Sequence, residues 1–205
     1  MKKYLFSLVL LLSAMTARAQ DEIMVNYLGS RPGIVDFVNA ILSQEDLGET
    51  LGFVADNWDR YRSGMPLGEG VTFLTDAPNG YARFDVSYEG TDRGYTEFCY
   101  WNCADGLHKV VAVNTGYTQG GKPIETETTG LDFYTYDNRA RTLKYVSAYD
   151  MGAVVEASST VTIELPRKGK DIKATIHDAQ QKKYVLMKWN GSKFNQQQVQ
   201  RTSGR

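Results

Sequence analysis

The sequence has few of the residues that metal and nucleotide sites need. Its 205 residues include two histidines and two cysteines, and these form no Cys/His cluster of the kind that binds zinc. The glycines of residues 116–121 lack the Lys and Ser/Thr of a phosphate-binding loop, and no G-x-S-x-G nucleophile elbow is present. We therefore expect no metal and no cofactor.

A surplus of positive charge is also missing. The chain has 23 Lys and Arg against 24 Asp and Glu, which gives a formal net charge of −1. Nucleic-acid binding depends on neutralising many phosphates, so we expect no nucleic-acid partner.

The only long apolar run lies at the start of the chain. Lys2 and Lys3 precede an apolar stretch over residues 4–15, and Ala17-Arg18-Ala19 gives the small-x-small pattern of a signal-peptidase site. The stretch is shorter than the roughly 20 residues that span a bilayer. We expect residues 1–19 to be a signal peptide and the mature chain to be periplasmic or secreted, with no transmembrane segment. Cleavage would remove three cations and no acid, which changes the net charge to −4.

The mature chain divides into a helical part and a β-rich part. Residues 20–32 are expected to be a linker, residues 33–194 a single α+β domain, and residues 195–205 a polar tail. Within residues 33–64, apolar residues recur at helical spacing in two stripes, which predicts two amphipathic helices. The first stripe is Ile34, Phe37, Val38, Ile41 and Leu42, and the second is Leu47, Leu51, Val54, Trp58 and Tyr61.

Residues 71–194 show short β-rich runs that are separated by turn residues. Asn79-Gly80 and Asn190-Gly191 are strong hairpin signals. The pattern predicts about ten strands, at residues 71–76, 81–88, 95–101, 107–114, 131–136, 142–149, 161–165, 172–177, 184–189 and 192–197. Short connections favour an antiparallel meander, packed against the two helices or closed into a barrel.

The two cysteines leave two possibilities open. An exported protein favours a disulfide between Cys99 and Cys103. If both lie on one extended strand, however, four residues separate their Cα atoms by about 13 Å, and a disulfide needs ~4.4 to 6.8 Å. A bridge therefore requires a bulge or turn at residues 100–102.

The same strand pairing supplies a hypothesis for catalysis. A hairpin through Asp105-Gly106 places Cys103 opposite His108, and Asp105 or Glu97 could orient the imidazole ring. Such a site would suit a cysteine-dependent hydrolase or transferase. None of the local signatures of cysteine peptidases surrounds Cys103, and a buried Cys beside a His fits most of the same facts.

Aromatic residues are abundant in the β-rich part and suggest a different function. Neighbouring strand residues point to opposite faces, so one aromatic of a pair such as Tyr100 and Trp101 could be exposed. Together with Tyr134 and Tyr136, they could form a row that stacks on a glycan or anchors a protein partner. In the alternative, helices or a closed barrel cover that face.

The leader and two β segments carry a family resemblance. The Lys-Lys start, the Leu-rich core, Ala19-Gln20, residues 98–103 and residues 189–194 resemble the small exported proteins of unknown function common in the Bacteroides group. This resemblance implies no catalytic residues. With no complete catalytic motif present, the sequence favours a non-catalytic binding module for a glycan, an envelope component or a protein, with the cysteine enzyme as the alternative. The oligomeric state is left open.

Overall fold

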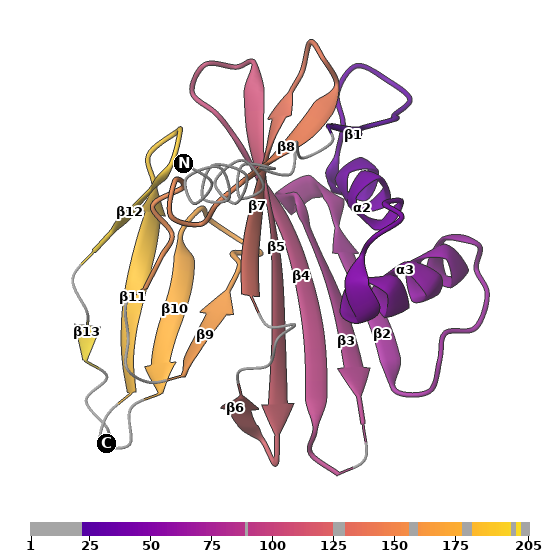
Figure 1. Ribbon diagram of the computed structural model, residues 1–205, viewed down its shortest axis with the longest axis vertical. Coiled ribbons are helices and arrows are strands. Elements are labelled where there is room, and N and C mark those ends of the chain that lie inside the picture. Colours follow the sequence, from indigo (N-terminus) through magenta and orange to yellow (C-terminus); the bar gives the residue numbers. More distant parts are fainter. Residues whose placement is uncertain are drawn as a thin grey trace, which may run out of the picture.

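The computed structural model describes residues 22–88, 90–124, 130–155, 160–177, 182–197 and 200–201. The expected signal peptide, residues 1–19, lies outside the described residues. Figure 1 shows two short helices on one side, long strands in the middle and a smaller sheet on the other side. The α+β class with an antiparallel sheet is thus confirmed.

The two predicted helices form where the apolar stripes lie. Helix α2 (Ile34–Leu42) buries its whole stripe against the large sheet. Helix α3 (Gly48–Arg62) buries Val54 and Trp58, while Tyr61 at its end remains 36% exposed. Asp36 caps α2 by accepting a hydrogen bond from the Gly33 amide at 2.8 Å, which satisfies one of the free N–H groups of the first turn.

The large sheet has eight strands in the order β1-β8-β7-β5-β4-β3-β2, with β6 beside β5. These are β1 (Ile23–Met24), β2 (Val71–Asp76), β3 (Tyr81–Ser87), β4 (Arg93–Asn102), β5 (His108–Gln119), β6 (Lys122–Ile124), β7 (Gly130–Asp137) and β8 (Thr142–Val146). The sheet curves into a half-barrel with β1 and β2 at its edges, and the helices lie on its concave face (Figure 1). The described strands therefore form an open sheet and not the closed barrel that was considered.

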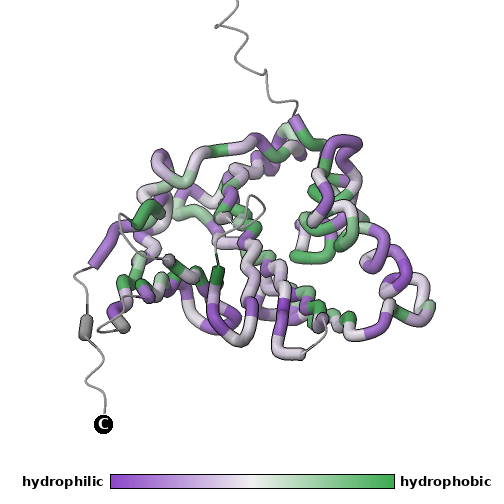
Figure 2. Tube along the Cα trace, turned by 60° about the horizontal axis from the view of Figure 1, so that its bottom comes forward, coloured by the Kyte–Doolittle hydropathy of each residue, from purple (hydrophilic) through white to green (hydrophobic). Residues whose placement is uncertain are grey.

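A second sheet of five strands packs against the convex face of the half-barrel. Its strands are β9 (Val161–Glu164), β10 (Ile172–His177), β11 (Lys182–Trp189), β12 (Phe194–Gln196) and β13 (Gln200–Arg201). In the turned view of Figure 2, the helices and this sheet remain on opposite sides of the long strands.

The strand count differs from the prediction. All ten predicted segments contain a strand, but β1, β6 and β13 were not predicted, and the strands form two sheets. The three additional strands have only two or three residues each, too few for a period-two pattern to be detected. As a result, the expected linker 20–32 contributes an edge strand, and the expected tail 195–205 contributes the end of β12 and all of β13.

Both Asn-Gly pairs lie in hairpin loops, although not in two-residue turns. Four residues separate the paired positions Asp76 and Tyr81, and four separate Trp189 and Phe194. In the second loop, the Asn190 side chain accepts hydrogen bonds from the Ser192 and Lys193 amides, at 2.9 and 3.0 Å. An Asx turn therefore takes the place of the two-residue turn that Asn-Gly usually forms in a hairpin.

Candidate functional site

The two faces of the half-barrel have different coverings, and this determines where a site can form. Along β4, alternate residues such as Phe98 and Tyr100 point toward the helices, and Glu97, Cys99 and Trp101 point toward the second sheet. The second sheet covers the convex face from Tyr81 to Phe133 with a buried core. The helices cover only part of the concave face (Figure 1).

Glu97 is the most buried carboxylate among the described residues, at 2% exposed, and lies between the two sheets. One of its oxygens accepts hydrogen bonds from the Tyr81 hydroxyl at 2.7 Å and from Arg83 at 3.0 Å. The other accepts from Asn114 at 2.9 Å and from the Leu165 amide at 3.1 Å. A carboxylate has about four lone-pair sites, so these four donors occupy it fully. Glu97 therefore joins the sheets and has no lone pair left to act as a general base.

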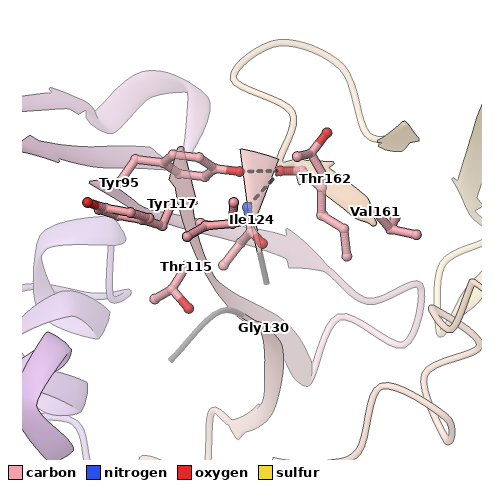
Figure 3. A pocket seen from close by; sticks show the side chains of 10 residues that line it. Tyr95, Thr115, Tyr117, Ile124, Gly130, Val161 and Thr162 are labelled. Carbon is pink, nitrogen blue, oxygen red and sulfur yellow. Dashed lines mark hydrogen bonds between the residues drawn. The ribbon is translucent and has the colours of Figure 1, made fainter. Parts of the chain in front are cut away.

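Tyr95 extends this polar network toward a cavity of about 250 Å³ at the junction of the two sheets, shown in Figure 3. The Tyr95 hydroxyl and the Asn114 amide both donate to the Ile163 carbonyl, at 3.3 and 2.8 Å. The Tyr95 ring covers Gly116, where a Cβ atom would lie 2.2 Å from the ring. Burial raises the pKa of Tyr95, so its hydroxyl stays a hydrogen-bond donor at neutral pH.

A larger cavity, of about 470 Å³, lies on the concave face beside helix α3. We call it the concave pocket. Its apolar walls are Phe53 of α3, Phe84 and Val86 of β3, Tyr88, and Tyr117 of β5. Thr96 and Thr115 form a neighbouring pair on β4 and β5 and also line it, and Glu49 and Thr50 contribute from the first turn of α3.

The concave pocket exists because strand β4 has a glycine at this level. Gly94 lies opposite Tyr117, and a Cβ atom on Gly94 would come within 2.9 Å of Val86. A side chain there would therefore reduce the space between β3 and β5. The hydrophobic walls remain partly open to solvent, since Phe53 is 44% and Tyr88 50% exposed. A volume of 300 to 1,000 Å³ is typical of small-molecule pockets.

The residues of the cysteine hypothesis do not form a nucleophile and base. The Cys103 amide donates to the His108 carbonyl at 3.0 Å, so the two residues are paired as predicted. The His108 ring, however, contacts the carboxylates of Asp105 at 2.6 Å and Asp137 at 3.7 Å. Burial and the nearby Asp105 raise the pKa of the Cys103 thiol, which opposes the thiolate that catalysis needs. Glu97 is engaged in the inter-sheet network and cannot orient His108.

Cys99 and Cys103 are both free thiols in the structure. Cys99 lies inside β4 and Cys103 directly follows it, and the ladder between β4 and β5 is regular from Arg93 to Asn102. This is the extended geometry in which the two sulfurs cannot meet. Cys99 is 2% exposed, and burial raises the pKa of its thiol to about 12.

The four aromatics proposed as a ligand-binding row lie in or against the two cores. Trp101 is 4% exposed and donates to the Lys170 carbonyl at 2.9 Å. Tyr136 is fully buried, and Tyr100 and Tyr134 pack against the core beneath the helices. They therefore do not form an exposed row, because the coverings on the two faces of the sheet bury Trp101 and Tyr136 and leave Tyr100 and Tyr134 only partly exposed.

The sequence hypotheses also missed the concave pocket. Phe84 and Val86 fit any half-buried strand, and their proximity to Phe53 depends on how α3 crosses the sheet. Gly94 and Gly116 lie inside the observed strands β4 and β5 but just outside the predicted segments 95–101 and 107–114. With longer predicted strands they would have been a signal, because a strand glycine often marks a place where other groups approach closely.

Within the described residues, no group of three or more His, Cys, Asp or Glu side chains could hold a metal ion. None of the helices described is long and apolar enough to cross a membrane. The chain matches no protein-family model, no curated protein and no solved structure.

Proposed function

We propose that the protein is an exported, non-catalytic binding module that takes the apolar part of an envelope component into the concave pocket. The observation that carries this proposal is the pocket itself, a partly open cavity of about 470 Å³ with walls made by Phe53, Phe84, Val86, Tyr88 and Tyr117. Its volume corresponds to roughly 15 water molecules at ~30 Å³ each. Burial of an apolar group of that size would be the main source of affinity.

The ring geometry favours an acyl chain or compact ring system over a sugar. Phe53 and Phe84 meet edge to face at 79°, and Tyr88 and Tyr117 are tilted by 58°. These rings enclose a volume and do not form one flat surface on which a sugar ring could stack. Thr96 supplies a hydroxyl group among the apolar walls, which suits a ligand with a polar atom.

The chemistry of the other candidates supports a binding role. Glu97 has its lone pairs occupied, His108 is held between two carboxylates, and the pKa of Cys103 is raised. Glu97 is therefore engaged elsewhere and the Cys103 thiol is in its less reactive form, and only the contact between His108 and Asp105 is the one that the enzyme hypothesis expects.

The test is a titration of the mature protein with the neutral hydrophobic dye N-phenyl-1-naphthylamine. Thr50→Phe places a ring at the rim of the pocket and should weaken dye binding by about tenfold or more, which corresponds to ~1.4 kcal/mol. Asp56→Phe, on the exposed side of the same helix, adds the same ring away from the pocket and should have no effect.

Phe53→Ala is a second test variant, because it removes a ring that forms one wall of the concave pocket. It should cost little stability, since the Phe53 side chain is already 44% exposed. The proposal is overturned if the dye shows no saturable binding, or if Thr50→Phe and Asp56→Phe change its affinity equally.

A further inference from the structure

A third cavity is lined by residues of the β7–β8 turn, of helices α2 and α3 and of the segment after strand β1. Figure 1 shows the β7–β8 turn, β1 and α2 near one another at the top right of the half-barrel. The volume of this cavity is about 530 Å³. The residues that matter are Tyr27, which follows β1, Asp36 and Asn39 of α2, Arg62 at the end of α3, and Arg141 of the β7–β8 turn. We call this cavity the arginine groove. It shares no lining residue with the concave pocket.

Two guanidinium groups line the groove, and both are held in place by neutral groups. Arg62 donates to the Asn39 side-chain oxygen at 2.9 Å, and the Arg141 guanidinium lies 4.8 Å from the centre of the Tyr27 ring. Within the described part of the chain, neither forms an ion pair with a carboxylate. Asp36 is the one acid in the lining, and it accepts the Gly33 amide hydrogen bond that caps α2. The groove thus has more positive than negative charge.

Asn39 adds a donor whose orientation is fixed. Its side-chain oxygen accepts hydrogen bonds from Trp58 at 2.7 Å and from Arg62 at 2.9 Å. Both partners can only donate, so this arm of the amide must be the oxygen. The NH₂ group occupies the other arm and is a donor in a residue that lines the groove.

Arg141 has a backbone conformation that favours glycine. Its φ is 57°, the one positive value among the described non-glycine residues. Its amide donates to the Asp137 carbonyl at 2.8 Å, and its carbonyl accepts from the Val25 amide at 2.9 Å. A glycine could make both bonds without strain. What arginine adds at this position is its guanidinium, which lies over the Tyr27 ring, and backbone outliers of this kind often accompany functional sites.

The Tyr136 hydroxyl is a buried polar group on the strand that precedes the β7–β8 turn. Tyr136 is fully buried, and its hydroxyl is the one buried side-chain polar atom without a hydrogen-bond partner in the described residues. Burial and the neighbouring Tyr27 raise the pKa of Tyr136, and Arg141 acts in the opposite direction. The Tyr136 ring also contacts Phe37 of α2, with ring centres 5.1 Å apart, so Tyr136 lies beneath the helix that supplies Asp36 and Asn39 to the groove.

We propose that the arginine groove binds an oxyanion, the carboxylate or phosphate group of a small ligand, with Arg62, Arg141 and the Asn39 amide as donors. Guanidinium groups match both anions because their N–H groups can donate in parallel pairs. This site is separate from the concave pocket and does not depend on the function proposed for it.

The test is a calorimetric titration of the mature protein with inorganic phosphate and, separately, with succinate, at constant ionic strength. Saturable binding of either anion is expected, and the tighter one identifies which oxyanion the groove prefers. Arg62→Gln and Arg141→Gly should each weaken binding about tenfold to a hundredfold, as expected for loss of hydrogen bonds to a charged group.

Two matched variants control for general charge. Arg139→Gln changes a neighbour in the same turn as Arg141, and Arg60→Gln changes a neighbour on the same helix as Arg62; neither residue lines the groove. Both should retain binding. The proposal is refuted if the controls weaken binding as much as the groove variants do, or if neither anion shows saturable binding.

A stability measurement separates this role from a structural one. Because glycine relieves the strain at position 141, Arg141→Gly should keep or raise the melting temperature while it loses the anion. A clear fall in melting temperature would instead mean that Arg141 serves the fold, and would overturn the proposal. Dye binding in the concave pocket should be unchanged in every groove variant.

Discussion

Replacement of Glu97 tests whether the inter-sheet network joins the two sheets. Glu97→Gln keeps the size of the side chain but turns one carboxylate oxygen into an NH₂ group. That group must face either the Tyr81 hydroxyl and Arg83 or Asn114 and the Leu165 amide. In both orientations, two groups that donate to Glu97 now meet another donor.

The size of the effect follows from these contacts. A buried donor that loses its acceptor destabilises the folded state by about 1–3 kcal/mol. Two such donors should therefore lower the free energy of unfolding by about 2–6 kcal/mol. The lower end applies if the Tyr81 hydroxyl turns to accept from the new NH₂ group while Arg83 keeps its hydrogen bonds to Asp85 at 2.8 and 2.9 Å. For a domain of this length, each kcal/mol lowers the melting temperature by about 2–4 °C.

The assay is urea unfolding of the mature protein, followed by far-ultraviolet circular dichroism and by tryptophan fluorescence. Glu164→Gln is the matched control, since Glu164 pairs with Lys173 at 3.2 Å with 56% of its side chain exposed. Exposed pairs contribute about 0–1 kcal/mol. If Glu97→Gln costs no more than Glu164→Gln, the carboxylate does not join the sheets and the reasoning fails.

Two further predictions concern the thiols and the phenols. Without reductant, a thiol reagent should label two cysteines in the unfolded protein. When the protein is folded, the reagent should label Cys103 slowly and should not label Cys99, which is buried. If no cysteine is labelled in the unfolded protein, the two cysteines form a disulfide and the prediction is wrong. Burial raises the pKa of Tyr134 to about 12 and also raises that of Tyr81. The unfolded chain therefore ionises first, near pH 10, and stability should fall as pH rises above about 10. A melting temperature that does not change between about pH 9 and about pH 11 would contradict this.

The helices and most strands could be predicted because their patterns are local. The stripe from Ile34 to Leu42 has the period of a helix, and every residue of it is buried. The runs after Val71 have strand composition and end at turn residues. Such signals need no knowledge of distant contacts, so they survive in a single sequence.

The division into two sheets could not be predicted, because it depends on which faces meet. Phe98 and Cys99 are consecutive and both buried, one beneath the helices and the other beneath the second sheet. A strand that is covered on both faces loses the alternation of apolar and polar residues that would reveal one exposed face. The same double burial explains why Trp101 and Tyr136 were interpreted as surface candidates.

The two proposed sites were missed for a related reason. Arg62 and Arg141 are 79 positions apart in the sequence. The positive φ of Arg141 cannot be predicted from its residue type, because it is glycine that usually adopts such a conformation. Glu97 did carry a signal, as the one carboxylate of β4 and directly before the apolar and aromatic residues 98–101. Its partners, however, come from β3, β5 and the segment after β9. Only the tertiary pairing brings these donors together.

The position of the concave pocket follows from how unequally the two faces of the half-barrel are covered. On the convex face, a five-stranded sheet buries an apolar core and brings the Leu165 amide to Glu97. The Glu97 carboxylate is therefore already hydrogen-bonded and not available to a ligand. On the concave face, α2 and α3 have 9 and 15 residues, which at ~1.5 Å per residue reach only about 14 and 22 Å. They cannot cover strands as long as β4 and β5, with 10 and 12 residues at ~3.3 Å each. Uncovered surface must remain beside the helices, and the apolar residues there are the ones most available to a partner.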